Sequence, residues 1–309
     1  MYFKPHAKVS KHLNLLLVIG VQLVALYLMW LASNLSLLWS IPIGIAFSFV
    51  LLTNYALMHE GAHHNLHVTQ RKNWLLGVLS SCLFPMAFTL YEHTHHTHHR
   101  GNRTDHEMFD CYYQGDNMLV KYWHWYGILA GFHWFNIPTG SLLMAVYPKI
   151  FKTKIFKRAK VSEILFDDFG PAEINRIRLE VLFSVIYWIA IWNLLGLQWQ
   201  AVAVLYAFFA FNWSTRQYLT HAFTPRDVIN GAVNLKVNGL HQLLLLNGNW
   251  DLVHHQHPHL PWTELPKYSE KSAAPVDFWR QYWAMWKGLE KSLEPAPMPI
   301  SREEYYHIS

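Results

Sequence analysis

Long apolar runs, separated by polar segments, are the dominant pattern in this sequence. A helix needs roughly 20 mostly apolar residues to cross a bilayer. Four runs approach or exceed this length, and they cover residues 13–31, 37–58, 181–197 and 199–219. Only short uncharged links separate the two runs of each pair. We therefore predict four transmembrane helices that are arranged as two hairpins.

Two further apolar stretches do not fit simple crossings. Residues 75–90 are few for a crossing, and histidine motifs flank them on both sides. Residues 123–147 are longer, but glycines and prolines such as Gly127 and Pro138 interrupt them. We predict interfacial or re-entrant helices for both. A six-span arrangement is the alternative, but it places the histidine motifs on opposite faces.

The remaining sequence is polar and occupies residues 91–122, 148–180 and 221–309. Lysines and arginines lie at the outer ends of the two hairpins, so the positive-inside rule places these ends in the cytoplasm. All histidine motifs then lie on that side. The predicted fold is an all-α integral membrane protein with a single domain, residues 1–309, whose cytoplasmic helical cap holds the site.

The composition agrees with a membrane protein. Hydrophobic residues make up 52% of the chain and charged residues only 15%, whereas about 25% are charged in typical soluble domains. The first apolar run is long and lacks a small-residue cleavage motif, so we expect no cleavable signal peptide. The two cysteines, Cys82 and Cys111, support neither a disulfide framework nor a thiolate zinc site.

The net charge of +5 comes from basic segments that lie next to apolar ones. Such segments are typical of cytoplasmic flanks or of contacts with anionic membrane lipids. We therefore expect membrane lipids rather than nucleic acid as partners. The basic segments are Lys4, Lys8 and Lys11, and a second cluster of Lys149, Lys152, Lys154, Lys157, Arg158 and Lys160.

Histidine is the residue type that points to chemistry. Of the 21 histidines, most lie in two windows, residues 59–106 and 254–259. Neutral imidazole offers a nitrogen lone pair and is the commonest protein ligand of metals. An ordinary core has no need of so many imidazoles in such short windows, so the clustering predicts a metal site with more than one ion.

The first motif lies where the second apolar run ends. His59 and His63 are four residues apart, so on a helix they share a face and can reach the same metal ion. His64 would be rotated from His63 by about 100° and is a weaker candidate. On its own, such a pair is equally typical of histidines that reach from a helix end to the membrane surface.

The second motif has the spacing H-x-x-H-H. His95, His98 and His99 project together from a helix, and such clusters are typical of metal sites. Asp105 and Glu107 follow, and their carboxylates are predicted to accept hydrogen bonds from the ring N–H groups of ligand histidines. A solvated loop is the alternative interpretation of these two carboxylates.

The third motif pairs His254 and His255 with Asp251, which stands three residues before the first of them. His221 follows the fourth apolar run, and Gln217 lies one turn before it. Eight imidazoles exceed the capacity of one ion, so we predict two ions. The predicted ligands are His59, His63, His95, His98, His99, His221, His254 and His255, with Asp251 as a further candidate. Iron suits these donors, as do zinc, copper and manganese.

In this order, the motifs resemble those of the integral-membrane fatty acid desaturase family. The family pattern is H-x-x-x-H, H-x-x-H-H and a C-terminal H-x-x-H-H, with another histidine at the end of the last span. The likeness covers roughly residues 13–266, including the phrase Pro258-His-Leu-Pro261-Trp262. It implies a di-iron centre at the cytoplasmic ends of a four-span bundle, with dioxygen as co-substrate.

The resemblance also implies oxidation of an unactivated C–H bond in a lipid acyl chain, most directly fatty acid desaturation. Two electrons would come from an external donor of the ferredoxin, rubredoxin or cytochrome b5 type, because we see no fused donor domain. A bacterial cytoplasmic membrane is favoured over the endoplasmic reticulum, since no retention element is present.

The sequence departs from the family pattern at the third motif, where Asp251 stands in place of a histidine. Gln217 stands where some relatives have an asparagine that bonds to iron through water. These departures leave the exact reaction open. Relatives with similar motifs act as hydroxylases, as carotenoid ketolases or as oxidases that form terminal alkenes.

Two other classes of protein compete with this interpretation. The segment His59-Glu60-Gly-Ala-His63 matches the H-E-x-x-H pattern of single-zinc hydrolases, but that reading leaves the other two motifs without a role. Metal transporters place ionisable residues inside their spans, whereas the apolar runs here are nearly free of charge. We therefore predict a membrane oxidoreductase.

Overall fold

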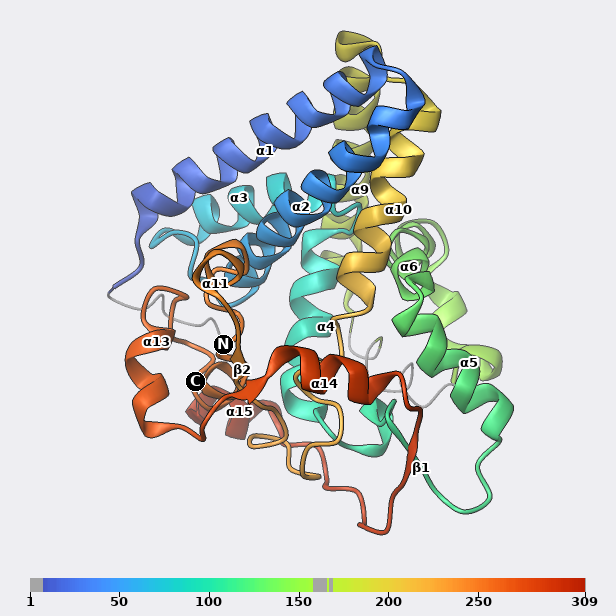
Figure 1. The fold of residues 1–309 in the computed structure, drawn as a ribbon, viewed down its shortest axis with the longest axis vertical. Helices are drawn as coiled ribbons and strands as arrows, with labels where there is room; N and C mark the ends of the chain where they lie inside the picture. Colours follow the sequence, from blue (N-terminus) through green and yellow to red (C-terminus); the bar gives the residue numbers. More distant parts are fainter. Residues whose placement is uncertain (1–7, 158–165, 167–168, 309) are drawn as a thin grey trace.

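The molecule has a part made of long helices and a part made of shorter elements. This computed structural model describes residues 8–157, 166 and 169–308. Four long helices converge toward one end, and the shorter C-terminal elements gather at the other (Figure 1). The long helices are α1 (Lys11–Asn34), α2 (Ser40–Ala62), α9 (Pro171–Leu195) and α10 (Trp199–Ser214).

Among the described residues, three helical segments are long and apolar enough to cross a membrane, namely Lys11–Asn34, Leu37–Ala62 and Pro171–Leu195. They correspond to three of the four predicted spans. The fourth predicted span, residues 199–219, is wrong in its last part, because α10 is a 16-residue helix that ends at Ser214. Beyond it the chain turns, and the Thr215 hydroxyl bonds to the hydroxyl of Tyr282 in the C-terminal region.

The helix α9 begins at Pro171, ten residues before the predicted span, so residues 171–180 belong to this helix rather than to a polar cap. Charged residues interrupt the apolar pattern there without interrupting the helix. Glu180 is buried against α3 (Gln70–Leu83) and α4 (Phe88–Gly101). Its carboxylate accepts hydrogen bonds from the Trp74 indole at 2.8 Å and from the Thr89 hydroxyl at 2.7 Å.

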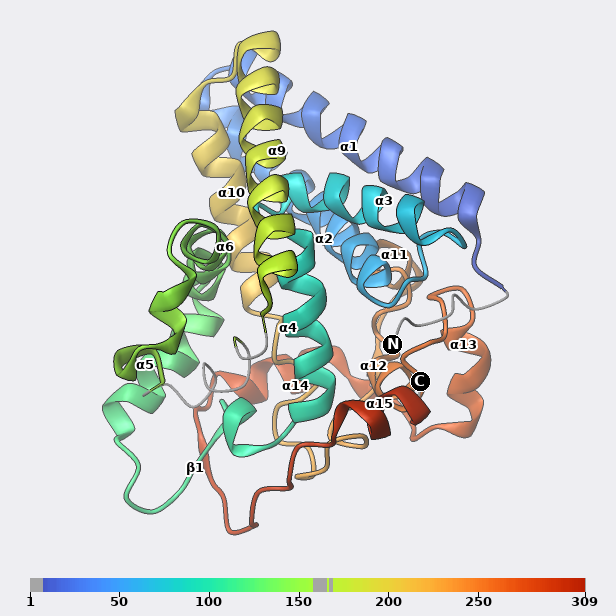
Figure 2. The same cartoon turned by 180° about the vertical axis from the view of Figure 1, so that it is seen from behind.

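The two helices α3 and α4 are bent by 96° relative to one another and together have the composition of a broken span or a re-entrant loop. Pro85 lies in the break and has no backbone N–H to continue the first helix. The break lies within residues 75–90, and the interpretation of this segment as interfacial or re-entrant stays a prediction. Figure 2 shows α9 beside both helices.

The predicted interfacial segment 123–147 consists of three pieces, which are α5 (Met118–Leu129), η3 (Phe132–Phe135) and α6 (Asn136–Val146). Gly131 separates the first two with a φ of 97°, a conformation that favours glycine. The interfacial position of this segment stays a prediction.

Helix α2 lies at the centre of the fold, in contact with α1, α3, α4, α10 and the short α11 (Gly239–Leu244). Phe47 and Leu51 of α2 are fully buried, as are Leu205 and Phe209 of α10. Outward-facing leucines of α1 and α9, such as Leu16 and Leu182, are exposed. An exposed apolar exterior over a buried core is typical of helices that face lipid.

The remaining elements are short and mostly C-terminal. In the described part of the chain, two short parallel strand pairs lie among them, β1 with β4 and β2 with β3. Part of the second basic cluster, Arg158 and Lys160, lies outside the described residues. The bounds are η1 Leu37–Trp39, η2 Asp105–Glu107, β1 Cys111–Tyr112, η4 Pro148–Lys152, α7 Lys154–Lys157, β2 Leu235–Lys236, α11 Gly239–Leu244, α12 Asp251–Gln256, α13 Leu265–Tyr268, η5 Ser269–Lys271, β3 Val276–Asp277, α14 Phe278–Met285, β4 Glu290–Lys291 and α15 Arg302–Ile308.

Candidate metal centre

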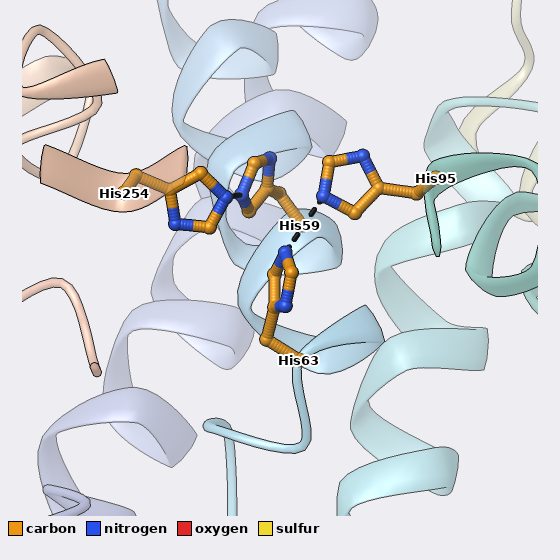
Figure 3. A group of neighbouring side chains, drawn as sticks. All are labelled: His59, His63, His95 and His254. Carbon is orange, nitrogen blue, oxygen red and sulfur yellow. Dashed lines mark hydrogen bonds between the residues drawn. The ribbon is translucent and has the colours of Figure 1, made fainter. Parts of the chain in front are cut away.

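The three histidine motifs meet in space although nearly 200 residues separate the first from the last. At the end of α2, the Nε2 atom of His59 lies 2.9 Å from Nε2 of His254. The Nε2 atom of His63 lies 2.7 Å from Nε2 of His95. Figure 3 shows these four rings turned toward one another. Their ligand atoms all lie within 4.8 Å of each other, so the group could hold a metal ion.

His99 adds a fifth ring to this group. Its Nε2 atom lies 3.2 Å from Nε2 of His95 and 3.1 Å from Nε2 of His254. A neutral imidazole nitrogen has either one N–H or one lone pair in the ring plane. The Nε2 atoms of His95, His99 and His254 each face two other nitrogens, so these close contacts cannot all be hydrogen bonds at the same time. A cation between the rings would satisfy them all.

A second group contains His98, His221 and His255, whose ligand atoms also lie within 4.8 Å of one another. Asp251 lies beside it, with Oδ2 at 3.4 Å from Nε2 of His221 and 3.9 Å from Nε2 of His255. This carboxylate oxygen is buried and has no hydrogen-bond partner within the described part of the chain. An orphaned carboxylate oxygen beside three imidazoles fits a metal site.

Polar partners orient two of these rings. Nδ1 of His98 lies 2.5 Å from the Glu107 carboxylate, and Nδ1 of His221 lies 3.1 Å from the carbonyl oxygen of Gly231. Each contact leaves Nε2 available to a metal ion. Partners of this kind fix the tautomer of metal-binding histidines and raise their basicity.

The electrostatic environment keeps the imidazoles of His254 and His255 neutral. Burial holds the pKa of His255 well below its usual value, and the neighbouring His221 lowers it further. Burial and the neighbouring His59 act in the same direction on the pKa of His254. Neutral rings keep the lone pairs that bind metal, and a bound cation would lose affinity if these rings were protonated.

The other two polar residues that the sequence suggested have different partners. Asp105 forms an ion pair with Arg226 at 3.1 Å. The Gln217 side chain accepts a hydrogen bond from the Tyr55 hydroxyl at 3.3 Å. Of Asp105, Glu107 and Gln217, only Glu107 makes a hydrogen bond to a predicted ligand among the contacts that the structure gives. The proposed water-mediated role of Gln217 stays a prediction.

His64 lies apart from both groups. It has a φ of 59°, and its ring lies 3.2 Å from the carboxylate of Glu92. Together with His96 these residues form a third cluster of possible ligands. Nδ1 of His96 already lies within hydrogen-bond distance of the Tyr305 hydroxyl, at 3.3 Å.

Arg103 helps to position the candidate ligands, although the sequence alone did not indicate this role. Arg103 is buried and donates hydrogen bonds to Asp110 at 2.7 Å, to the Tyr218 hydroxyl at 2.8 Å and to the carbonyl of Thr224 at 2.9 Å. These bonds tie the loop after the second motif to the turns that position His221. A charged residue close to a predicted ligand is the only sequence signal for this role.

A cavity of about 410 Å³ lies against the metal groups. Its lining includes His59, His98 and Asp251. Elsewhere the walls are mostly apolar and aromatic. Examples of such residues are Leu52, Phe84, Leu90, Ile137, Trp213, Leu246 and Phe278. A mostly apolar cavity that borders candidate metal ligands has the polarity expected of a binding site for a lipid chain.

Replacing Glu107 by alanine is expected to weaken metal binding by about 10–100-fold, because His98 would lose the carboxylate that orients its ring. Competition with a chromophoric chelator would measure the affinity. Asp105→Ala is the matched control, since this carboxylate lies two residues away and pairs with Arg226. Equal losses in the two variants would contradict the orienting role of Glu107.

Comparison with known proteins agrees with this geometry. The family model described as fatty acid desaturase matches residues 37–288, a region that contains all three histidine motifs. No curated protein matches the chain significantly. Together with the three candidate spans, the family match indicates a membrane protein that acts on lipids. The chain therefore belongs to the fatty acid desaturase family.

Proposed function

We propose that this protein is a di-iron oxidase that uses dioxygen and two electrons from a separate donor protein to desaturate a lipid acyl chain. The main support is the convergence of three distant histidine motifs beside a mostly apolar cavity. Neither a membrane transporter nor a single-zinc site needs this combination. The family match supports the same class of reaction.

Eight histidines and one aspartate would hold two iron ions. His59, His63, His95 and His254 form the first set, and His98, His221, His255 and Asp251 form the second. His99 lies between them, with its ring centre 4.4 Å from that of His255. When bound, the two iron ions would provide the redox chemistry by which dioxygen oxidises an unactivated C–H bond. Imidazole and carboxylate donors without thiolates suit iron.

The protein's own residues would position the chain and exclude water. Phe84 and Trp213 pack edge to face, with ring centres 5.0 Å apart, in the cavity wall. Tyr55 lies against both and precedes His59 by one helical turn. Rigid aromatic walls restrict the acyl chain to a few poses. The position of the reacting carbon at the ångström scale then decides between two outcomes. Removal of a second hydrogen gives an alkene, and addition of oxygen gives an alcohol.

We propose the cytoplasmic face of a bacterial membrane as the location of the metal centre. Basic residues at the start of α1 and around η4 and α7, such as Lys8, Lys11, Lys149 and Lys152, support this orientation. A ferredoxin, rubredoxin or cytochrome b5 type of donor would then reach the site from the same side.

Product analysis with isotope-labelled oxygen tests this proposal. We expect iron in purified protein at two ions per chain. We also expect cells that express it to gain an unsaturated lipid product without the label. A labelled alcohol would favour a hydroxylase, and a labelled ketone a ketolase. One zinc ion per chain, with no oxidised lipid, would overturn the proposal.

The Glu60→Gln variant separates an oxidase from an H-E-x-x-H hydrolase. Glu60 is buried, and its carboxylate accepts a hydrogen bond from the backbone N–H of Trp262 at 3.1 Å. Glutamine can accept the same bond, so we expect the variant to keep its metal and most of its lipid oxidation. A hydrolase that uses Glu60 as general base would lose about 10²–10⁴-fold in rate. A loss of that size in the rate of hydrolysis would favour the hydrolase over the oxidase.

A further inference from the structure

Arg216 is a charged residue in the wall of the cavity, just beyond the end of α10. Its Nε atom donates to the side-chain oxygen of Asn212 at 3.0 Å, and Nη1 lies within hydrogen-bond distance of Nε2 of His241. The guanidinium lies over the ring of Phe278, with 5.1 Å between its carbon and the ring centre, and near Phe49 at 5.9 Å. None of these four neighbouring side chains is a carboxylate.

This guanidinium has no carboxylate partner among the residues that the structure describes. Arg103 pairs with Asp110, and Arg226 pairs with Asp105, but no such ion pair involves Arg216. Burial, assisted by the positive charge of Arg216, lowers the pKa of His241 to about 4. His241 is therefore neutral near pH 7 and leaves the charge of Arg216 uncompensated. Arg216 is only partly buried, but a charge with low exposure and no opposite charge nearby is still costly, so its presence requires an explanation.

The cavity provides that explanation. Arg216 is the only lysine or arginine among the described residues that line it. The Nη2 atom of Arg216 donates no hydrogen bond within the described part of the chain. The planar guanidinium offers parallel N–H donors that match the two oxygens of a carboxylate. A single anion that enters the cavity would supply the missing charge.

We propose that Arg216 binds the carboxylate of an unesterified fatty acid, so that the substrate of this protein is the free acid. The inference rests on the proposed oxidation of a lipid chain and names the head group of that lipid. The acyl chain would extend from Arg216 through the apolar cavity toward the metal groups. Phe49 precedes His59 by ten residues, about 15 Å along the axis of α2, so the two ends of the substrate occupy different parts of the cavity.

Other head groups fit the cavity less well. The carbonyl of a thioester or an ester has no charge and would leave Arg216 without a partner. A coenzyme A or phospholipid head carries phosphate groups and considerable bulk, and it would call for several cations. One partly buried cation in the wall of a mostly apolar cavity matches one small monovalent anion attached to a long apolar chain.

Binding measurements on the metal-loaded, full-length protein in lipid nanodiscs test this inference without requiring turnover. Palmitate is expected to bind about 10–100-fold more tightly than methyl palmitate, the range given by a charge-assisted hydrogen bond. Palmitoyl-coenzyme A is expected to bind no better than the ester. This ligand series uses the unmodified protein, so it does not depend on the folding of a variant.

The Arg216→Gln variant is expected to lose the preference for palmitate while its affinity for methyl palmitate stays the same. Arg216→Lys should keep part of the preference, because the charge remains but the planar fork is lost. Arg280→Gln is the control, since Arg280 is exposed on α14. Thermal unfolding of each variant would check that the fold is intact.

Equal binding of acid and ester by the unmodified protein would overturn the inference, as would tighter binding of palmitoyl-coenzyme A. A preference for palmitate that survives in Arg216→Gln would also overturn it. The proposed function can fail separately. Palmitate that binds through Arg216 but yields no oxidised product would leave the carboxylate site in place and refute the oxidase.

Discussion

Replacing His63, His98 or His255 by alanine is expected to abolish lipid oxidation and to reduce the metal content of the purified protein. Each variant removes an imidazole from a group whose ligand atoms lie within 4.8 Å of one another. His63→Ala affects the first group, whereas His98→Ala and His255→Ala affect the second. We therefore expect iron to fall from two ions per chain toward one in each case, as measured by inductively coupled plasma mass spectrometry.

The matched control is His12→Ala, because His12 is an exposed histidine of α1 outside both groups. It should change neither the metal content nor the product. The same is expected of His6 and His307, although His6 and the side chain of His307 lie outside the described residues. Full activity in His98→Ala or His255→Ala would contradict a centre built from all three motifs.

The apolar pattern predicted the long helices well but not their ends. Charged residues such as Glu173 and Arg176 precede the apolar run of α9. The helix nevertheless includes them, because they occupy its first turns. The pattern therefore located the apolar centre of this helix and missed its beginning. At the C-terminal end of α10, the predicted span continued through residues 215–219, but the helix ends at Ser214 and Thr215 instead contacts the distant Tyr282. Tertiary contacts of this kind leave no periodic signal.

The candidate ligands follow from spacing, because positions three and four residues apart project from one helix face. Spacing does not show which group each histidine joins. His98 and His99 are neighbours in the sequence, yet His98 belongs with His221, and His99 lies between the groups. Arg216 was overlooked for a related reason. A lone cation near the end of an apolar run resembles a flanking charge until its surroundings are known.

Replacing Asp251 by alanine is expected to remove the second metal ion while the first stays bound. Asp251 precedes His254 and His255 by three and four residues on α12, so its carboxylate projects from the same face as the two rings. Its buried Oδ2 atom has no hydrogen-bond partner among the described residues and lies 3.4 Å from Nε2 of His221. A metal ion beside these atoms would satisfy both of them.

The affinity loss in Asp251→Ala should exceed the roughly 10–100-fold that removal of an outer partner causes, because here a direct donor is lost. Asp251→His restores the H-x-x-H-H spacing of the family and should retain two ions, which makes it the informative companion variant. Metal titration of the two proteins under identical conditions gives the comparison. If Asp251→Ala bound two ions as tightly as the unmodified protein, the carboxylate would be no ligand, and His98, His221 and His255 would have to hold the second ion alone.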